Sequence, residues 1–171
     1  MPTTPHAGAS GIDPRRMAIY LNDHLAGATV GVELARRALA SNRGSELGRF
    51  LARLVREVEE DRSALERVME QLGLPQDRLK VLVGWAGEKV GRLKPNGQLT
   101  GYSPLSRVVE LEGLSLGVEG KLAAWRSLER AVGGDARLEG IDFAALIARA
   151  TEQRRELERH RLEATDLALT P

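Results

Sequence analysis

The apolar spacing between positions 47 and 72 constrains this chain more than any other sequence feature. Apolar residues recur there every three or four positions, which is the pattern of one face of an amphipathic helix of about six turns. These residues are Leu47, Leu51, Leu54, Val58, Leu65, Val68 and Leu72. Asp61 occupies a position in this stripe where an apolar residue is expected. Because an isolated buried charge is costly, Asp61 must be paired, bound to a metal or at the solvent-facing edge of the stripe.

Four positions carry the start signals of long helices. Asp13-Pro14 and Ser103-Pro104 combine an N-cap residue with proline at the first helical position, and Ser45 and Asp142 are also suitable N-caps. The expected helices cover residues 14–40, 45–73 and 104–132, and a fourth begins after Asp142. The seam of this fourth helix is expected to contain Leu146, Ala150, Leu157, Ala164 and Leu167, interrupted by Gln153 and His160.

The connections between these helices differ in length. Residues 41–44 form a loop short enough to make the first two helices antiparallel neighbours. About 30 residues separate the second helix from the third, whereas about two to eight are usual between bundle helices. This crossover is expected to contain a helix of its own, at residues 77–93.

Two helical hairpins joined by a long crossover resemble the ferritin-like superfamily, and the resemblance covers residues 15–168. It implies an all-α fold, namely a ferritin-like antiparallel four-helix bundle with an additional helix in the long crossover between helices two and three. Residues 1–12 are expected to form a disordered N-terminal tail, and residues 13–171 a single helical-bundle domain.

The composition excludes several classes of function. The 25 basic and 24 acidic residues leave a net charge of +1, which argues against a nucleic-acid partner or an anionic membrane surface. No apolar run reaches the length of a membrane helix, about 18 residues. The chain has no cysteine, so disulfides and thiolate sites are excluded. The start of the chain lacks signal-peptide features, which predicts a cytoplasmic protein, and the excess of arginine over lysine suggests a bacterial genome rich in GC.

The resemblance also implies a di-iron carboxylate site, in which two helices each supply a Glu-x-x-His motif. None of the three histidines, His6, His24 and His160, has a glutamate three positions before it. An irregular site can still be drawn from side chains on or beside the seams, and it would suit iron, manganese or zinc. Its ligands would be Glu57, Asp61, Glu112, Glu119, Glu156 and His160.

The alternative to a metal site is a set of structural pairs. Asp61 would then pair with an arginine such as Arg126, and the glutamates would be solvated. His160 would lie at the edge of the seam, hydrogen-bonded to a neighbouring carboxylate.

Glycines also recur at helical spacing, although each costs a helix interior about 0.5 to 1 kcal/mol relative to alanine. They are Gly27 and Gly31, then Gly84, Gly87 and Gly91, then Gly113, Gly117 and Gly120. One interpretation is close crossing of helices through these small residues. The other is a cleft for a small ligand, with Tyr20 and His24 on its wall and Trp85 or Trp125 nearby.

Three functions remain open. The first is a non-catalytic or catalytically degenerate bundle with a binding or scaffolding role, which self-associates as a dimer. The second is a metal-dependent oxidoreductase of the di-iron or manganese carboxylate type, with an irregular site. The third is a small-ligand binder that uses the glycine-lined cleft. The sequence indicates no particular reaction, so whether the protein is an enzyme stays open at this point.

Overall fold

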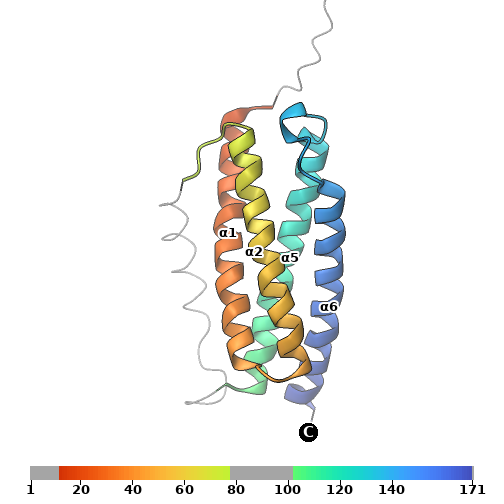
Figure 1. The fold of residues 1–171 in the computed structure, drawn as a ribbon. Helices are drawn as coiled ribbons and strands as arrows, with labels where there is room; N and C mark the ends of the chain where they lie inside the picture. The colour runs from red at the N-terminus through yellow and green to blue at the C-terminus, as the bar shows by residue number, and fades with distance from the viewer. Residues whose placement is uncertain (1–11, 78–101, 171) are drawn as a thin grey trace, which may run out of the picture.

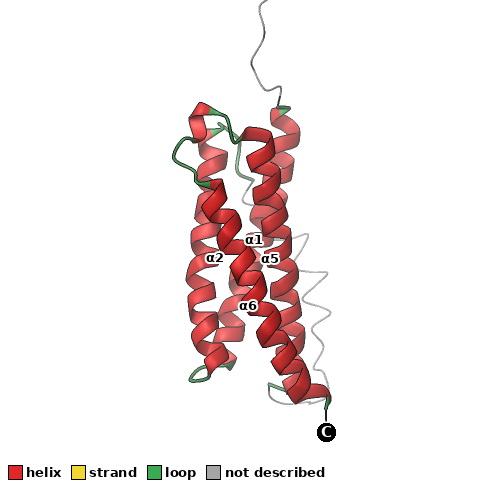
Figure 2. Ribbon diagram, turned by 90° about the vertical axis from the view of Figure 1, so that its right-hand side faces the viewer, coloured by secondary structure: helices red, strands yellow, loops and turns green. Residues whose placement is uncertain are grey.

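The computed structural model describes residues 12–77 and 102–170. These residues form four long helices and one short 3-10 helix, and Figure 2 shows no strand among them. The helices are α1 (Pro14–Ser41), α2 (Glu46–Gln71), α5 (Pro104–Val132) and α6 (Phe143–Leu169), and the 3-10 helix is η1 (Ala136–Leu138). The predicted all-α four-helix bundle is therefore confirmed. The expected N-terminal tail and crossover helix lie outside the described residues except for Ile12 and Asp77.

Local capping fixes where these helices begin and end. The side chains of Asp13, Ser45, Ser103 and Asp142 each accept a hydrogen bond from a backbone N–H at the start of the following helix, at 2.9–3.2 Å. The four predicted helix starts are thus confirmed. At the end of α2, Gly73 has a φ of 70°, which glycine adopts without strain, and the next N–H closes the turn onto the Met69 carbonyl at 2.9 Å.

The four long helices run side by side, and each is opposite in direction to the helices that it contacts most closely. Figure 1 shows α1 descending, α2 and α5 ascending, and α6 descending. Close backbone contacts join α1 to α2, α1 to α5 and α5 to α6, whereas α2 and α6 are joined mainly through side-chain pairs such as Arg53–Glu156 and Arg149–Asp61. Because α2 and α5 both ascend, α2 ends at the upper end of the bundle and α5 begins at the lower end. None of the described helices is both long and apolar enough to cross a membrane.

The apolar core is divided into two parts along the bundle. The upper core, near the top of Figure 1, contains Leu21, Leu25, Ala64, Leu65, Val68, Met69, Leu72, Leu122, Trp125, Leu128, Val132, Leu138, Phe143, Leu146 and Ala150. The lower core contains Ala35, Ala38, Phe50, Leu51, Leu54, Val108, Leu111, Leu114, Val118, Leu157 and Ala164. Most predicted seam positions are buried in these two groups. Leu167 is an error of prediction, because it lies in the last turn of α6 and is 69% exposed.

Candidate functional site: a buried polar layer and an adjacent groove

A layer of polar side chains separates the upper core from the lower core. Asp61 on α2 is only 2% exposed and accepts hydrogen bonds from two cationic side chains. Lys121 Nζ on α5 donates to Asp61 Oδ2, and Arg149 Nη2 on α6 donates to Asp61 Oδ1. Lys121 also donates to Gln153 Oε1, and Gln153 Nε2 donates to Glu57 Oε2 at 2.8 Å. We call these five residues the polar layer.

The electrostatics of the layer depend on the balance between burial and pairing. Burial lowers the pKa of Lys121, because the ammonium group loses water, and the Asp61 carboxylate partly offsets that shift. Arg149 shifts the Lys121 pKa further down, since it places a second positive charge nearby. Asp61 on α2 therefore pairs with one cation of α5 and one of α6. Removing any of these three charged groups would leave another without a partner that it now has.

The sequence indicated that Asp61 must be paired, and the pairing with an arginine is confirmed. The arginine is Arg149, however, and the expected Arg126 is an exposed residue of α5. The second cation, Lys121, was missed. Its position carries a signal, because Lys121 lies three residues after Val118 and four before Trp125, both of which are buried. A lysine at that spacing stands in the apolar stripe of α5 as Asp61 does in α2.

The five carboxylates predicted as metal ligands each have a lysine or arginine partner. Apart from the Asp61 pairs, the pairs are Glu57–Arg53 at 3.7 Å, Glu112–Arg161 at 4.0 Å, Glu119–Arg154 at 3.1 Å and Glu156–Arg53 at 2.9 Å. The structure brings Glu57 and Asp61 into the polar layer and leaves Glu112 and Glu119 half exposed on the outside of α5. Within residues 12–77 and 102–170, no group of three or more His, Asp or Glu side chains is arranged to hold a metal ion.

The sixth predicted ligand, His160, is buried in the lower half of α6 and is 2% exposed. Its Nε2 atom lies 2.9 Å from Arg159 Nη2, and its Nδ1 atom lies 3.2 Å from Glu163 Oε2. Because arginine can only donate, Nε2 is the acceptor and Nδ1–H donates to the carboxylate. The ring also packs on Phe50 at a centroid distance of 4.9 Å. The predicted hydrogen bond from His160 to a neighbouring carboxylate is therefore present, whereas the ring is buried rather than at the edge of the seam.

A second buried polar cluster joins the lower ends of α1 and α5. Glu110 accepts hydrogen bonds from Arg37 Nε at 2.9 Å and from the Tyr102 hydroxyl at 3.0 Å. Asn42 donates to the same hydroxyl oxygen at 2.9 Å. Burial raises the pKa of Tyr102, while the hydrogen bond from Asn42 acts in the opposite direction. These contacts tie the first turns of α5 to the end of α1, so we assign them a structural role.

The predicted cleft residues Tyr20 and His24 contact each other near the start of α1. Their rings meet edge to face at a centroid distance of 4.6 Å. Burial lowers the pKa of His24, and Asp23 partly offsets this shift. Trp125, in contrast, is buried in the upper core. Trp85 and the glycines of the expected crossover helix lie outside the described residues, and ligand binding by the pair stays a prediction.

Among the described residues, close crossing at the glycine stripes is found at Gly113. A Cβ atom added at Gly113 would lie 3.0 Å from Leu34 Cδ2, which is close packing. A Cβ atom added at Gly27, Gly31, Gly117 or Gly120 would meet no other described side chain or neighbouring backbone within 4 Å. In the described part of the chain these four glycines therefore face open space.

Beside the polar layer, an open groove of about 650 Å³ lies where α2 and α6 diverge, next to the start of α6. Arg56, Ser63 and Arg67 of α2 line one side, and Leu146 and Arg149 of α6 line the other. We call this the α2–α6 groove. A smaller depression of about 100 Å³ lies below it, and Arg149 lines both. Sequence reasoning missed the groove, because it depends on the separation of two helices rather than on a motif.

Comparison with known proteins adds no relative. No family model matches the chain. No curated protein and no solved structure is detectably similar to it either.

Proposed function

We propose that this protein is a non-catalytic, ferritin-like helical bundle with a binding role, in which Lys121 occupies the place that a metal ion would take. The observation that carries the proposal is the position of the Lys121 ammonium group. It contacts Asp61 and Gln153 between the two halves of the core, among the side chains expected to bind a metal. A divalent cation there would meet the ammonium group and Arg149 at close range, which is unfavourable.

The arrangement of the helices supports the ferritin-like part of the proposal. Two helical hairpins, with α2 ending and α5 beginning at opposite ends, have the order of a bundle with one long crossover. A binding role fits the α2–α6 groove, which offers exposed cationic side chains next to apolar ones. Self-association as a dimer remains part of the proposal, and exposed Leu116, Leu162 and Leu169 on α5 and α6 supply apolar surface for it.

Elemental analysis of protein purified without chelator or metal-affinity tag tests the absence of a metal role. We expect no stoichiometric iron, manganese or zinc in the wild type after supplementation with each ion. About one or two ions per chain, lost in both Asp61→Asn and His160→Ala, would refute the proposal. Lys121→Gln serves as the matched variant, because it removes the internal cation and leaves the carboxylates in place. Light scattering on the same wild-type samples reports the subunit number.

A further inference from the structure

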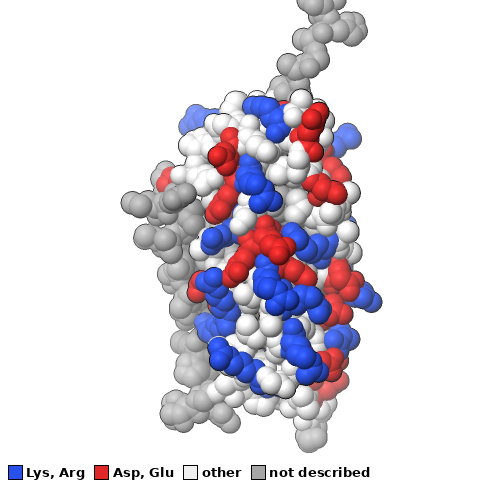
Figure 3. Space-filling model, viewed as in Figure 1, with Lys and Arg blue, Asp and Glu red and all other residues white. Residues whose placement is uncertain are grey.

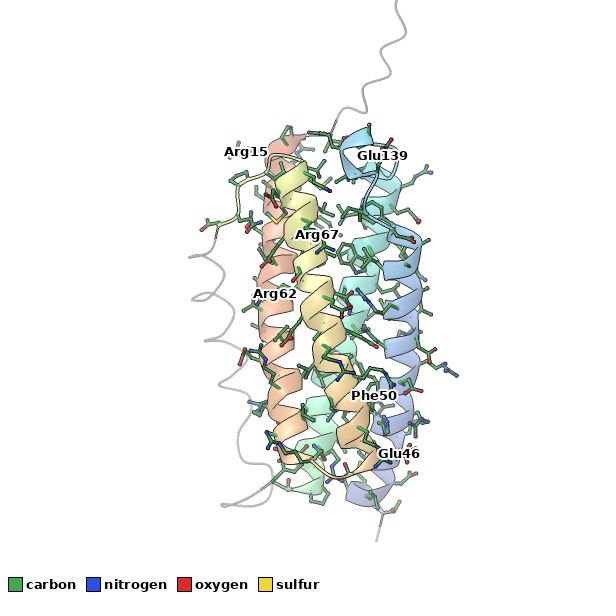
Figure 4. All side chains as sticks on the ribbon, in the orientation of Figure 1. Arg15, Glu46, Phe50, Arg62, Arg67 and Glu139 are labelled. Carbon is green, nitrogen blue, oxygen red and sulfur yellow. The ribbon has the colours of Figure 1, made fainter. Side chains whose placement is uncertain are left out.

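The charges of the α2–α6 groove follow a fixed order along α2. Arg56 and Arg67 are eleven residues apart, about 16 Å along the helix axis. Both line the groove, both are exposed, and neither forms an ion pair with another described residue. Arg56 donates only to the backbone of its own helix, at 3.1 Å. Figure 4 marks Arg67 on the upper half of α2. Among the described residues, the groove therefore carries one unpaired arginine toward each end, and the Asp142 carboxylate in its lining caps the start of α6.

The acidic side chains between these arginines are already neutralised. Glu59 is bound by Arg36 at 2.6 Å, and Glu60 is bound by Arg149 at 2.9 Å. Figure 3 shows the same order on this face, with a central acidic group and basic side chains above and below it. Apolar contact surface is supplied by Ile141 and Ala145, which line the groove and are at least partly exposed.

This charge order disfavours a second copy of the chain as the occupant. Two copies that met through the same face would be related by a two-fold axis. Whether the two α2 helices then ran parallel or antiparallel, an arginine of one copy would face an arginine of the other across the interface. Like charges in opposition cost affinity, so the groove suits a different partner.

A small anion is also a poor match for the groove, because it cannot contact both arginines. It would reach only one of the two arginines, since they are about 16 Å apart. A helix laid along α2 can reach both, because residues eleven positions apart in a helix are separated by the same distance and lie on nearly the same face. Helices that bind in grooves use an apolar stripe for affinity and flanking charges for register.

We propose that the α2–α6 groove binds a helical segment of another protein. This segment carries acidic residues at two positions eleven apart, with apolar or basic side chains between them on the same face. The carboxylates pair with Arg56 and Arg67, and the apolar side chains pack on Ile141 and Ala145. The inference rests on the proposed function, because it names the partner of a bundle that works by binding.

Fluorescence anisotropy with the full-length protein tests the inference. The probe is a labelled helical peptide of about 18 residues with two glutamates eleven positions apart and leucines between them. We expect saturable binding to the wild type and a loss of about tenfold or more in affinity for Arg56→Glu/Arg67→Glu. The same variant should bind a peptide in which both glutamates are replaced by lysine, which the wild type should bind at least about tenfold more weakly.

Two controls separate docking in the groove from general attraction of charge. Arg126→Glu/Arg130→Glu makes the same change of net charge at exposed positions of α5 outside the groove, and its affinity should match that of the wild type. Ala145→Trp fills the groove wall without changing charge and should also weaken binding about tenfold or more. No saturable binding to the wild type, or equal losses in the groove and control variants, would overturn the inference. Metal lost on Asp61→Asn would refute only the proposed function.

Discussion

Single and combined substitutions in the polar layer test whether its buried ion pairs contribute net stability to the fold. Asp61→Leu leaves the Lys121 ammonium buried with Gln153 as its remaining partner, and removing one partner of a buried pair costs about 3 to 5 kcal/mol. Lys121→Met leaves Asp61 paired with Arg149, so we expect a smaller loss of about 1 to 3 kcal/mol.

The combined Asp61→Leu/Lys121→Met/Gln153→Leu variant should recover most of that loss. It removes every buried polar group that depends on Lys121, and Arg149 keeps its pair with Glu60. Apolar residues of similar volume in place of a buried ion pair are often neutral or stabilising, so we expect a free energy of unfolding within about 1 kcal/mol of the wild type.

Urea unfolding followed by circular dichroism measures these free energies. The slope with denaturant must stay constant across the four proteins, because a changed slope would signal loss of two-state unfolding. If the triple variant is less stable than Asp61→Leu alone, the polar layer contributes net stability and the reasoning is wrong. A Lys121→Met loss larger than that of Asp61→Leu would also contradict it, because Asp61 would then depend on Lys121 rather than on Arg149.

Four further predictions concern single residues. Gly48→Ala should destabilise the protein by about 1 to 3 kcal/mol, because its Cβ would lie 2.2 Å from a backbone oxygen of the loop between α1 and α2. Gly117→Ala should instead stabilise the protein by about 0.5 to 1 kcal/mol. Urea unfolding measures both changes, and changes of the same sign in Gly48→Ala and Gly117→Ala would contradict the structure. Hydrogen bonds from the side chain and backbone of Arg137 lower the pKa of Asp135 to about 2, so an NMR titration should find it there and nearer its ordinary value in Arg137→Ala. The stabilisation from Asp135 is therefore present above about pH 4 and lost as the pH falls through about 2. Burial lowers the pKa of His24, so the unfolded chain binds the proton more tightly and stability should fall as the pH drops below about 6.5. Unfolding midpoints should show a smaller fall in His24→Gln, and an unchanged fall would exclude His24 as its source.

The bounds of the helices could be predicted because the signals for them are local. A cap such as Asp13 or Ser103 satisfies N–H groups only two or three residues away, and both lie where predicted. The buried stripes follow from the period of the helix in the same way. Leu167 departs from this rule, because the last turn of α6 leaves it exposed although the spacing continues.

The candidate site could be predicted only in part, and the limit is physical. That Asp61 needs a partner follows from the cost of burying a charge, which the sequence position already implies. Which cations reach Asp61 depends on how α5 and α6 are positioned along α2. In the folded bundle these are Lys121 and Arg149 rather than Arg126. The α2–α6 groove likewise exists because those two helices diverge, and helix separation is decided by packing across the whole bundle. Local chemistry in the sequence therefore determined the elements, while the charge pairs and the open surface were decided by tertiary packing, since they join residues about 30 to 90 positions apart.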